Sequence, residues 1–207
     1  MKININPPLP VLDILQKFRR AKYEVYIAGG VIRDALLNKP LYDWDLTTNA
    51  TPEQILEIFP EGFYDNKFGT VGIKNGDERP IEITTFRTES GYSDARHPDK
   101  ISWGKSLNED LKRRDFTINA MALDGHFELV DPHCGLRDLH NKTIRAVGDA
   151  HERFDEDALR MLRAVRIASQ LGFNIEPQTL KAIQDNAANI KKISAERIHD
   201  ELFENVL

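Results

Sequence analysis

Two aspartates stand one residue apart, at positions 43 and 45, with a tryptophan between them. In a β-strand, residues i and i+2 project from the same face, so Asp43 and Asp45 are expected to lie side by side. Two adjacent carboxylates repel each other and offer the hard oxygen ligands that suit Mg²⁺, which also takes phosphate oxygens. The pair therefore indicates a two-metal phosphoryl-transfer site. A solvated strand edge and capping of the following turn are the structural alternatives.

A third carboxylate from a neighbouring strand would complete such a site. Glu82 lies in the stretch PIEITTFR, whose alternation is typical of a strand, and it is the natural candidate for this catalytic role. An ordinary exposed strand position is the alternative for Glu82.

The stretch YIAGGVIRD places two glycines where a predicted strand ends and a helix begins. At Gly29 and Gly30 backbone N–H groups could approach a phosphate closely, and Arg33, one turn into the helix, could add charge-assisted hydrogen bonds. An ordinary tight turn is the alternative. A Rossmann dinucleotide site is disfavoured, because the G-x-G-x-x-G fingerprint is absent.

The elements that must position these residues form two halves. Up to about residue 145, strand and helix patterns alternate, which predicts an α+β fold with a small mixed sheet and flanking helices. Thr51 and Pro52 indicate a capped helix start. Beyond residue 150 helical periodicity takes over. Three helices are predicted there: one with an apolar face at 158, 162, 165, 168 and 171, a second with 180, 183, 187 and 190, and a third capped by Ser194 with 198, 202 and 206.

Composition narrows the functional classes. Of the 207 residues 41% are hydrophobic and 29% charged, with no apolar run that approaches a membrane span. The formal net charge of −5 disfavours a protein that binds nucleic acid over its whole surface. Cys134 is the only cysteine, so an internal disulfide is impossible and a cytoplasmic, reducing location is expected.

Seven stretches occur in an order that resembles one enzyme family, the class II tRNA nucleotidyltransferases or CCA-adding enzymes, together with the related bacterial poly(A) polymerases. The stretches are GGVIRD, DWDLTTNATP, FGTVGI, EITTFR, RRDFTINAMA, EDALRMLRAVRIASQLGF and SAERIHDEL. The resemblance runs from about residue 25 to 207. It implies a polymerase beta-like nucleotidyltransferase head over residues 1–148 and an all-helical neck over 149–207, without the family's body and tail.

The same resemblance assigns roles to residues of the head. It makes Asp43 and Asp45 the metal-binding catalytic pair, while Gly30 and Arg33 correspond to triphosphate contacts. Arg114 matches a nucleotide-binding arginine.

Two polar residues of the stretch RRDFTINA join this predicted nucleotide site. Asp115 and Asn119 lie one helical turn apart and could reach a ribose hydroxyl. Capping of a helix by Asp115 is the alternative.

The stretch EDALRMLRAVR is predicted to read the base. Asp157 and Arg160 stand at i and i+3 of a helix, and Arg163 and Arg166 follow at the same interval. A carboxylate accepts from the exocyclic amine of cytosine or adenine, and a guanidinium donates to the adjacent ring nitrogen, so the pair would reject uracil and guanine. A salt-bridge ladder on the helix surface is the alternative.

The predicted function is Mg²⁺-dependent, template-independent addition of CCA to tRNA 3′ ends from CTP and ATP. Poly(A) polymerases tend to carry paired basic residues where this chain has only Lys67 before Phe68. The loop 87–99 resembles the flexible loop of CCA-adding and A-adding enzymes, although a disordered polar connection fits its composition. A-only, CC-only or poly(A) addition remain alternatives. A non-catalytic RNA-binding module is the different class, and it would not need both aspartates.

Overall fold

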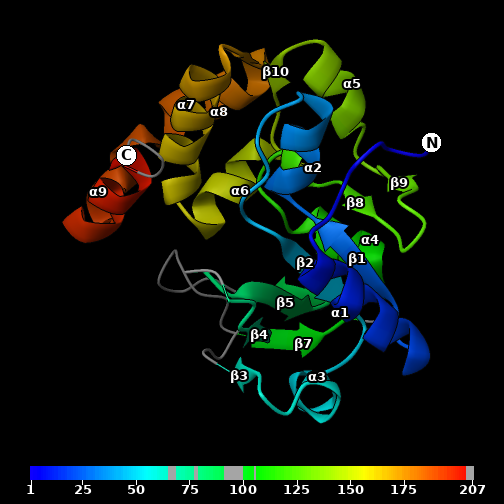
Figure 1. Cartoon of the computed structure of the whole chain (residues 1–207). Coiled ribbons are helices and arrows are strands. Elements are labelled where there is room, and N and C mark those ends of the chain that lie inside the picture. The colour runs from blue at the N-terminus through cyan, green and yellow to red at the C-terminus, as the bar shows by residue number, and fades with distance from the viewer. Residues whose placement is uncertain (65–68, 77–78, 91–99, 105, 204–207) are drawn as a thin grey trace.

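The fold is seen in a computed structural model that describes residues 1–64, 69–76, 79–90, 100–104 and 106–203. A seven-stranded sheet in the order β3-β4-β5-β2-β1-β8-β9 forms its first part (Figure 1). Strands β2 and β5 are parallel and the other neighbours antiparallel, so the predicted mixed sheet is confirmed. The strands are β1 (Val25–Ala28), β2 (Asp45–Thr48), β3 (Phe63–Tyr64), β4 (Thr70–Ile73), β5 (Ile81–Thr85), β8 (Ala122–Leu123) and β9 (Leu129–Val130).

Helices flank this sheet and then replace it toward the end of the chain, where α7, α8 and α9 stand to one side of the strands (Figure 1). The α-helices are α1 (Leu9–Arg20), α2 (Gly30–Leu36), α3 (Pro52–Ile58), α4 (Leu107–Lys112), α5 (Gly135–His140), α6 (Ala150–Glu156), α7 (Leu159–Leu171), α8 (Pro177–Asn186) and α9 (Ala195–Phe203). Two 3₁₀ helices are η1 (Thr117–Asn119) and η2 (Ala187–Lys192). None of the helices in the described ranges is long and apolar enough to cross a membrane.

Two further strand pairs lie outside the main sheet. Strands β6 (Arg87–Ser90) and β7 (Lys100–Trp103) are antiparallel, and β10 (Thr143–Ile144) and β11 (Asn174–Ile175) are parallel. Lys67 and Phe68, at the position where poly(A) polymerases tend to carry paired basic residues, and residues 91–99 of the predicted loop lie outside the described residues.

Local sequence signals explain where the helix that follows β2 begins. The Thr51 hydroxyl accepts a hydrogen bond from the Gln54 N–H at 3.4 Å, and the Gln54 side chain accepts one from the Thr51 N–H at 2.9 Å. Pro52 occupies the first position of α3, where its missing N–H costs nothing. The predicted helix start is confirmed as a complete capping box.

Two large groups of buried side chains hold the fold together. The first packs α1, α2 and α3 against the sheet. The second joins α6, α7 and α8 to Phe116, Ile118, Leu139 and Ile144, which precede residue 148. The helical part therefore shares its core with the end of the α+β part, and residues from both sides of position 148 fix their relative placement.

The predicted apolar faces of the last helices need correction. Helix α7 buries Met161, Ala164, Ile167 and Ala168, whereas Val165 is 51% exposed. In α8 the buried residues are Thr179 and Ala182, and Leu180 is 41% exposed. Helices α7 and α8 each carry apolar residues on more than one side, so the sequence alone does not determine which side is buried. Packing against α6, and for α7 also against β10 and β11, determines it. For the third helix, the Ser194 hydroxyl caps α9 as predicted, and residue 206 lies outside the described ranges.

Candidate functional site

A cleft of about 890 Å³ lies between the sheet and α7. Twelve of the thirteen site residues predicted from the sequence line it: Gly29, Gly30, Arg33, Asp43, Asp45, Arg114, Asp115, Asn119, Asp157, Arg160, Arg163 and Arg166. They come from β2, α2, the stretch around η1, and α7 with the turn before it. The fold thus gathers residues from both halves of the chain into one site.

The two aspartates that raised the first hypothesis are both exposed in this cleft. Asp45 is the first residue of β2, and Trp44 between the two aspartates is buried. Although open to the cleft, the Asp45 carboxylate is surrounded by protein atoms, and this loss of hydration raises its pKa. The nearby Asp43 charge raises the pKa further, while Arg114 and Arg163 oppose the shift.

Glu82 is where the strand argument predicted it, but not in the cleft. It lies on β5 in register with Asp45 of the parallel strand β2, so the two side chains share a face of the sheet. The Glu82 side chain is exposed but is not among the residues that line the cleft. Its proposed part in the chemistry therefore has weaker geometric support than that of the Asp43 and Asp45 pair.

The glycine turn leaves room that a side chain would fill. Gly29 has φ +86°, a conformation that L side chains rarely adopt, and a Cβ there would lie 3.1 Å from Nη1 of Arg114 and 3.6 Å from Oδ2 of Asp45. A Cβ on Gly30 would lie 3.3 Å from Nη2 of Arg33. No side chain at these two positions therefore covers the backbone between the Asp45 carboxylate and the guanidinium groups of Arg33 and Arg114.

Arg33 is held in place by hydrogen bonds from two directions. Its guanidinium donates to Oδ1 of Asn119 at 2.8 Å and to both carboxylate oxygens of Asp34 at 2.8 and 2.9 Å. The Asn119 amide in turn donates to Oδ1 of Asp115 at 3.2 Å. Three of the predicted nucleotide-binding residues, Arg33, Asn119 and Asp115, thus form one chain of hydrogen bonds.

Asp115 has a local partner and a distant one. Its Oδ1 accepts from the Phe116 N–H at 2.7 Å, and Oδ2 pairs with Nε of Arg163 on α7 at 2.8 Å. Burial would raise the pKa of Asp115, but Arg163 and the Phe116 N–H, with smaller help from Arg160 and Asn119, bring it below its ordinary value. The carboxylate is thus held ionised where the two halves of the chain meet.

Arg114 lies against a buried carboxylate that the sequence reasoning missed. Asp110 is fully buried and pairs with Arg113 at 2.7 Å and with Arg114 at 3.4 Å. It also accepts a hydrogen bond at 3.3 Å from the hydroxyl of Thr47, which lies two residues after Asp45 on β2. Among the described residues no hydrogen-bond partner reaches the buried Nε of Arg114. The i+3 and i+4 spacing of Arg113 and Arg114 is a signal that the sequence offered, whereas the burial of Asp110 and its contact with Thr47 depend on the tertiary structure.

The predicted helical pair Asp157 and Arg160 is arranged differently from expectation. Asp157 does not lie within a helix: α6 ends at Glu156, α7 begins at Leu159, and Oδ1 of Asp157 accepts from the Leu159 N–H at 3.0 Å. An aspartate can break a helix in this way, because its side chain satisfies an unpaired N–H of the next one. Both residues still line the cleft.

The side-chain partners of Asp157 and Arg160 also differ from a row of salt bridges along one helix. Asp157 pairs through Oδ2 with Nη2 of Arg197 at 2.8 Å. Arg160 donates to Glu156 at 2.6 Å and to the carbonyl oxygens of Arg153 and Arg113, each at 3.3 Å. Arg160 therefore bridges the helical part and the segment that carries Arg114.

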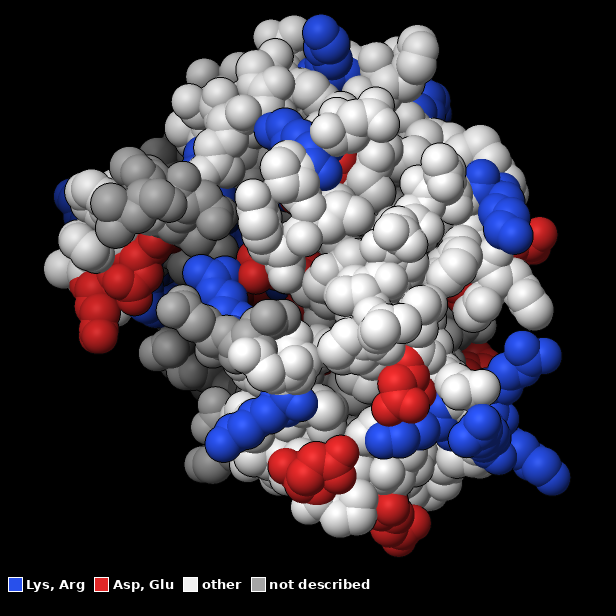
Figure 2. All heavy atoms as spheres, in the orientation of Figure 1, with Lys and Arg blue, Asp and Glu red and all other residues white. Residues whose placement is uncertain are grey.

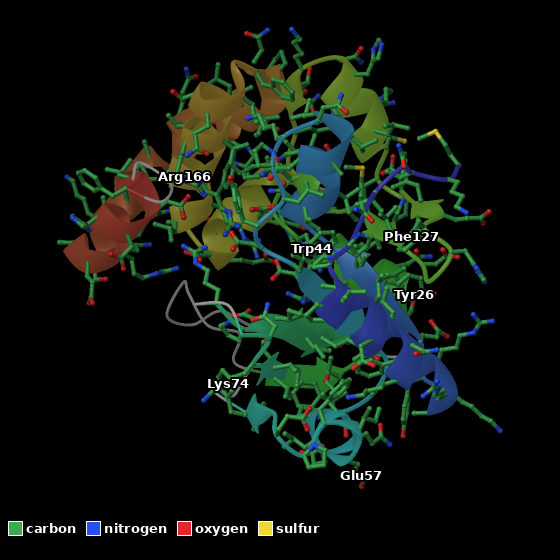
Figure 3. The ribbon with its side chains drawn as sticks, in the orientation of Figure 1. Tyr26, Trp44, Glu57, Lys74, Phe127 and Arg166 are labelled. Carbon is green, nitrogen blue, oxygen red and sulfur yellow. The ribbon has the colours of Figure 1, made fainter. Side chains whose placement is uncertain are left out.

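Arg166 ties α7 to α9 at one end of the cleft (Figure 3). Its Nε lies 2.7 Å from Oε1 of Glu201, and the two side chains are only 10% and 5% exposed. Arg166 also donates to the Gln170 side chain at 3.1 Å. This arginine is held by structural partners and still contributes to the cleft lining.

The cleft concentrates positive charge in a chain that is negative overall. Nine cationic side chains line it against five aspartates, whereas the whole chain carries −5. The cations that the sequence reasoning missed are Lys39, Arg87, Arg113 and Arg197. On the face drawn in Figure 2, basic and acidic side chains are intermingled around the edge of the molecule. The excess of four positive charges is what a polyanionic ligand such as a nucleoside triphosphate requires.

Comparison with protein families gives two matches along the chain. Residues 25–145 match a family described as the poly A polymerase head domain. Residues 172–204 match one described as a probable RNA and SrmB-binding site of polymerase A.

Curated relatives and solved structures agree with these matches. A CCA-adding enzyme of Lactobacillus helveticus is 51% identical over 93% of this chain and 48% of its own length, and one of Enterococcus faecalis is 49% identical over 94% and 48%. The chain thus spans about half the length of these curated relatives.

Two solved structures show a similar fold. The Bacillus stearothermophilus CCA-adding enzyme in complex with CTP has a TM-score of 0.86 at 42% identity, over 96% of this chain and 48% of that one. A tRNA nucleotidyltransferase complexed with a primer tRNA and an incoming ATP analogue has a TM-score of 0.75 at 32% identity, over 91% and 54%. With its head region matched and its fold shared, the chain belongs to the poly A polymerase head domain family, which confirms the resemblance seen in the sequence motifs.

Proposed function

We propose that this chain is the catalytic part of a Mg²⁺-dependent, template-independent nucleotidyltransferase that adds CCA to tRNA 3′ ends from CTP and ATP and releases pyrophosphate. Residues 1–148 act as the head and 149–207 as the neck, and the reaction takes place in the cytoplasm. The observation that carries the proposal is one cleft lined by a carboxylate pair, an excess of arginines, and the Asp157 and Arg160 pair.

The donor set at Asp43 and Asp45 fits Mg²⁺. Both carboxylates are exposed at the start of β2 and line the cleft, and burial together with the Asp43 charge raises the pKa of Asp45. Two carboxylates with phosphate oxygens and water form the usual magnesium environment. When bound, the metal would activate the attacking 3′ hydroxyl and neutralise the leaving pyrophosphate.

The triphosphate is bound by backbone N–H groups of the Gly29–Gly30 turn and by the arginines on either side of it. Gly29 and Gly30 expose backbone beside Asp45, while Arg33 and Arg114 flank the turn. Arg114 lines the cleft with a partly exposed side chain, so its guanidinium can donate to a phosphate oxygen. Asp34 and Asp110 hold these two arginines in place through ion pairs.

The sugar and base are bound on the other wall. Asp115 and Asn119, already linked to each other, lie where a ribose hydroxyl can exchange hydrogen bonds with them. Asp157 accepts from an exocyclic amine and Arg160 donates to the neighbouring ring nitrogen, so cytosine and adenine are accepted and uracil and guanine refused. Because both residues belong to the protein, base choice needs no nucleic-acid template.

The named relatives support CCA addition over the alternatives. The curated relatives cited above are CCA-adding enzymes, and one structural relative holds CTP. Addition of A alone, of CC alone or of a poly(A) tail shares the same head chemistry. A non-catalytic RNA-binding module would not account for exposed paired carboxylates inside a basic cleft.

The decisive experiment supplies each nucleotide separately. The purified chain is incubated with Mg²⁺ and tRNAs that lack CCA, CA or A, and with labelled CTP, ATP, UTP or GTP in turn. CCA addition predicts C on the first two substrates and A on the third. Addition of A alone or of long A tracts would select the alternatives. RNA binding without incorporation of any nucleotide, with the fold confirmed by circular dichroism, would support a binding module and overturn the proposal.

A further inference from the structure

Arg197 is the direct partner of the carboxylate that we assign to base reading. Its Nη2 lies 2.8 Å from Oδ2 of Asp157, 40 residues away in the sequence, and the two side chains are only 21% and 19% exposed. Both residues line the cleft. The ion pair is therefore part of the cleft wall and is shielded from much of the solvent that weakens surface pairs.

The Asp157 carboxylate is fixed at both oxygens. Oδ1 accepts from the Leu159 N–H at 3.0 Å, and Oδ2 accepts from Arg197. An ionised carboxylate has room for about four hydrogen bonds, so each oxygen keeps a free acceptor position. The backbone contact sets where the group lies, and the Arg197 contact sets how it is rotated about its last bond.

Arg160 cannot replace Arg197 in this task, because its own donors are directed elsewhere. Its guanidinium contacts Glu156 and the backbone of Arg153 and Arg113. The two groups assigned to the base are thus oriented by separate partners. The partner of Asp157 comes from α9 and that of Arg160 from α6 and the head.

The position of Arg197 depends on how α9 docks. Ser194 caps the start of α9, and Glu201 near its end forms the nearly buried pair with Arg166 of α7. Arg197 stands between these two fixed points and on the side that faces Asp157. The docking of α9 on α7 therefore determines the orientation of a carboxylate in the cleft.

We infer that Arg197 is a specificity-determining positioning residue, which holds the Asp157 carboxylate in the rotation that accepts from the exocyclic amine of cytosine or adenine. This inference rests on the proposed function of the cleft. Without the Arg197 guanidinium, Oδ2 can rotate away or take another donor, and the discrimination between an amine and a carbonyl on the base weakens. The rate with correct nucleotides is affected less, because Arg197 contacts Asp157 and not the reacting groups.

The test compares Arg197→Ala, Arg197→Gln and Arg197→Lys with Lys192→Ala, a control that removes an exposed cation shortly before α9. Two quantities are measured for each: equilibrium binding of CTP against UTP, and the ratio of C and A to U and G incorporation. Arg197→Ala and Arg197→Gln should lower both selectivities by roughly tenfold, as loss of one charge-assisted hydrogen bond implies. Arg197→Lys should retain part of the selectivity, because an ammonium can keep the ion pair. Lys192→Ala should match the parent chain.

Asp157→Ala separates the two proposals. If Asp157→Ala loses selectivity while every folded Arg197 variant keeps it, the positioning role is wrong and the proposed function stands. If Asp157→Ala also keeps selectivity, base reading by this cleft is wrong. Thermal unfolding is measured for each variant. A lower midpoint with unchanged selectivity in Arg197→Lys and Arg197→Gln would reduce Arg197 to a structural ion pair and overturn the inference.

Discussion

The guanidinium of Arg79 lies 2.9 Å from Oδ1 of Asp43, so one member of the paired carboxylates already has a cationic partner. Arg79 lies two residues before the start of β5, and the side chains of Arg79 and Asp43 are both largely exposed. The positive charge of Arg79 offsets the repulsion between Asp43 and Asp45, as a bound metal ion would. Arg79 and a divalent cation are therefore expected to compete for the same oxygen.

Arg79→Ala should tighten binding of Mn²⁺, used as a spectroscopic substitute for Mg²⁺, by up to about fivefold, the equivalent of one exposed ion pair. Titration followed by electron paramagnetic resonance measures this directly. Lys74→Ala removes an exposed cation from the preceding part of the same hairpin and serves as the control for overall charge. Equal affinities in the parent chain and both variants would show that Arg79 does not compete with the metal.

Asp43→Ala and Asp45→Ala should each reduce nucleotide transfer at least about a hundredfold, because loss of a direct metal ligand exceeds the usual effect of losing an outer partner. The fold should persist, since each change removes one of two repelling charges at an exposed strand end. Incorporation under saturating Mg²⁺ and the midpoint of thermal unfolding are the two measurements. Near-normal turnover in either variant would remove this pair from the chemistry.

Asp110→Asn tests the buried carboxylate behind the arginines. Burial opposes its charge, but Arg113 and Arg114 bring its pKa below the ordinary aspartate value. A depressed pKa gives stability that is present above the unfolded pKa and is lost as the pH falls through the folded one. The substitution should therefore lower the free energy of unfolding by about 3 kcal/mol at pH 7 and by much less in acid below that range.

Urea unfolding at several pH values measures this difference, and Asp13→Asn, at an exposed ion pair on α1, is the control. The KM for CTP should also rise in Asp110→Asn, because Arg113 and Arg114 lose their anchor. A stability loss that does not change with pH would contradict the assigned ionisation.

Asp157→Ala and Arg160→Ala should each lower the preference for CTP and ATP over UTP and GTP, at about 1–3 kcal/mol per base contact. The structure sharpens the expected coupling, because Asp157 contacts Arg197 and Leu159 whereas Arg160 contacts other groups. A double-mutant cycle should show coupling in selectivity, where one base joins both residues, and near-additivity in unfolding free energy. The reverse pattern would favour a purely structural role.

Local patterns in the sequence were sufficient for much of the fold and for most members of the site. The spacing of Asp43 and Asp45 predicted that the two carboxylates lie near each other, and Thr51 with Pro52 predicted where α3 begins. Such signals depend on residues within one turn or one strand, so they can be seen without the rest of the chain. The ordered motifs identified the family for the same reason.

The partners of those residues were decided only by the tertiary structure. Asp157 was expected on one helix with Arg160, but its side chain accepts from the Leu159 N–H at the start of α7 and pairs with Arg197 from α9. Glu82 was expected beside Asp45 and is in register with it, yet the cleft forms without it.

The choice of buried face on α7 and the burial of Asp110 were likewise invisible in the sequence. Arg113 and Arg114 follow Asp110 at helical spacing, but its contact with Thr47 joins segments tens of residues apart, and burial changes which charges can be left without a partner. Sequence spacing determined which chemical groups this protein carries near one another, and packing determined which of them are paired, which are buried, and which are left to face the cleft.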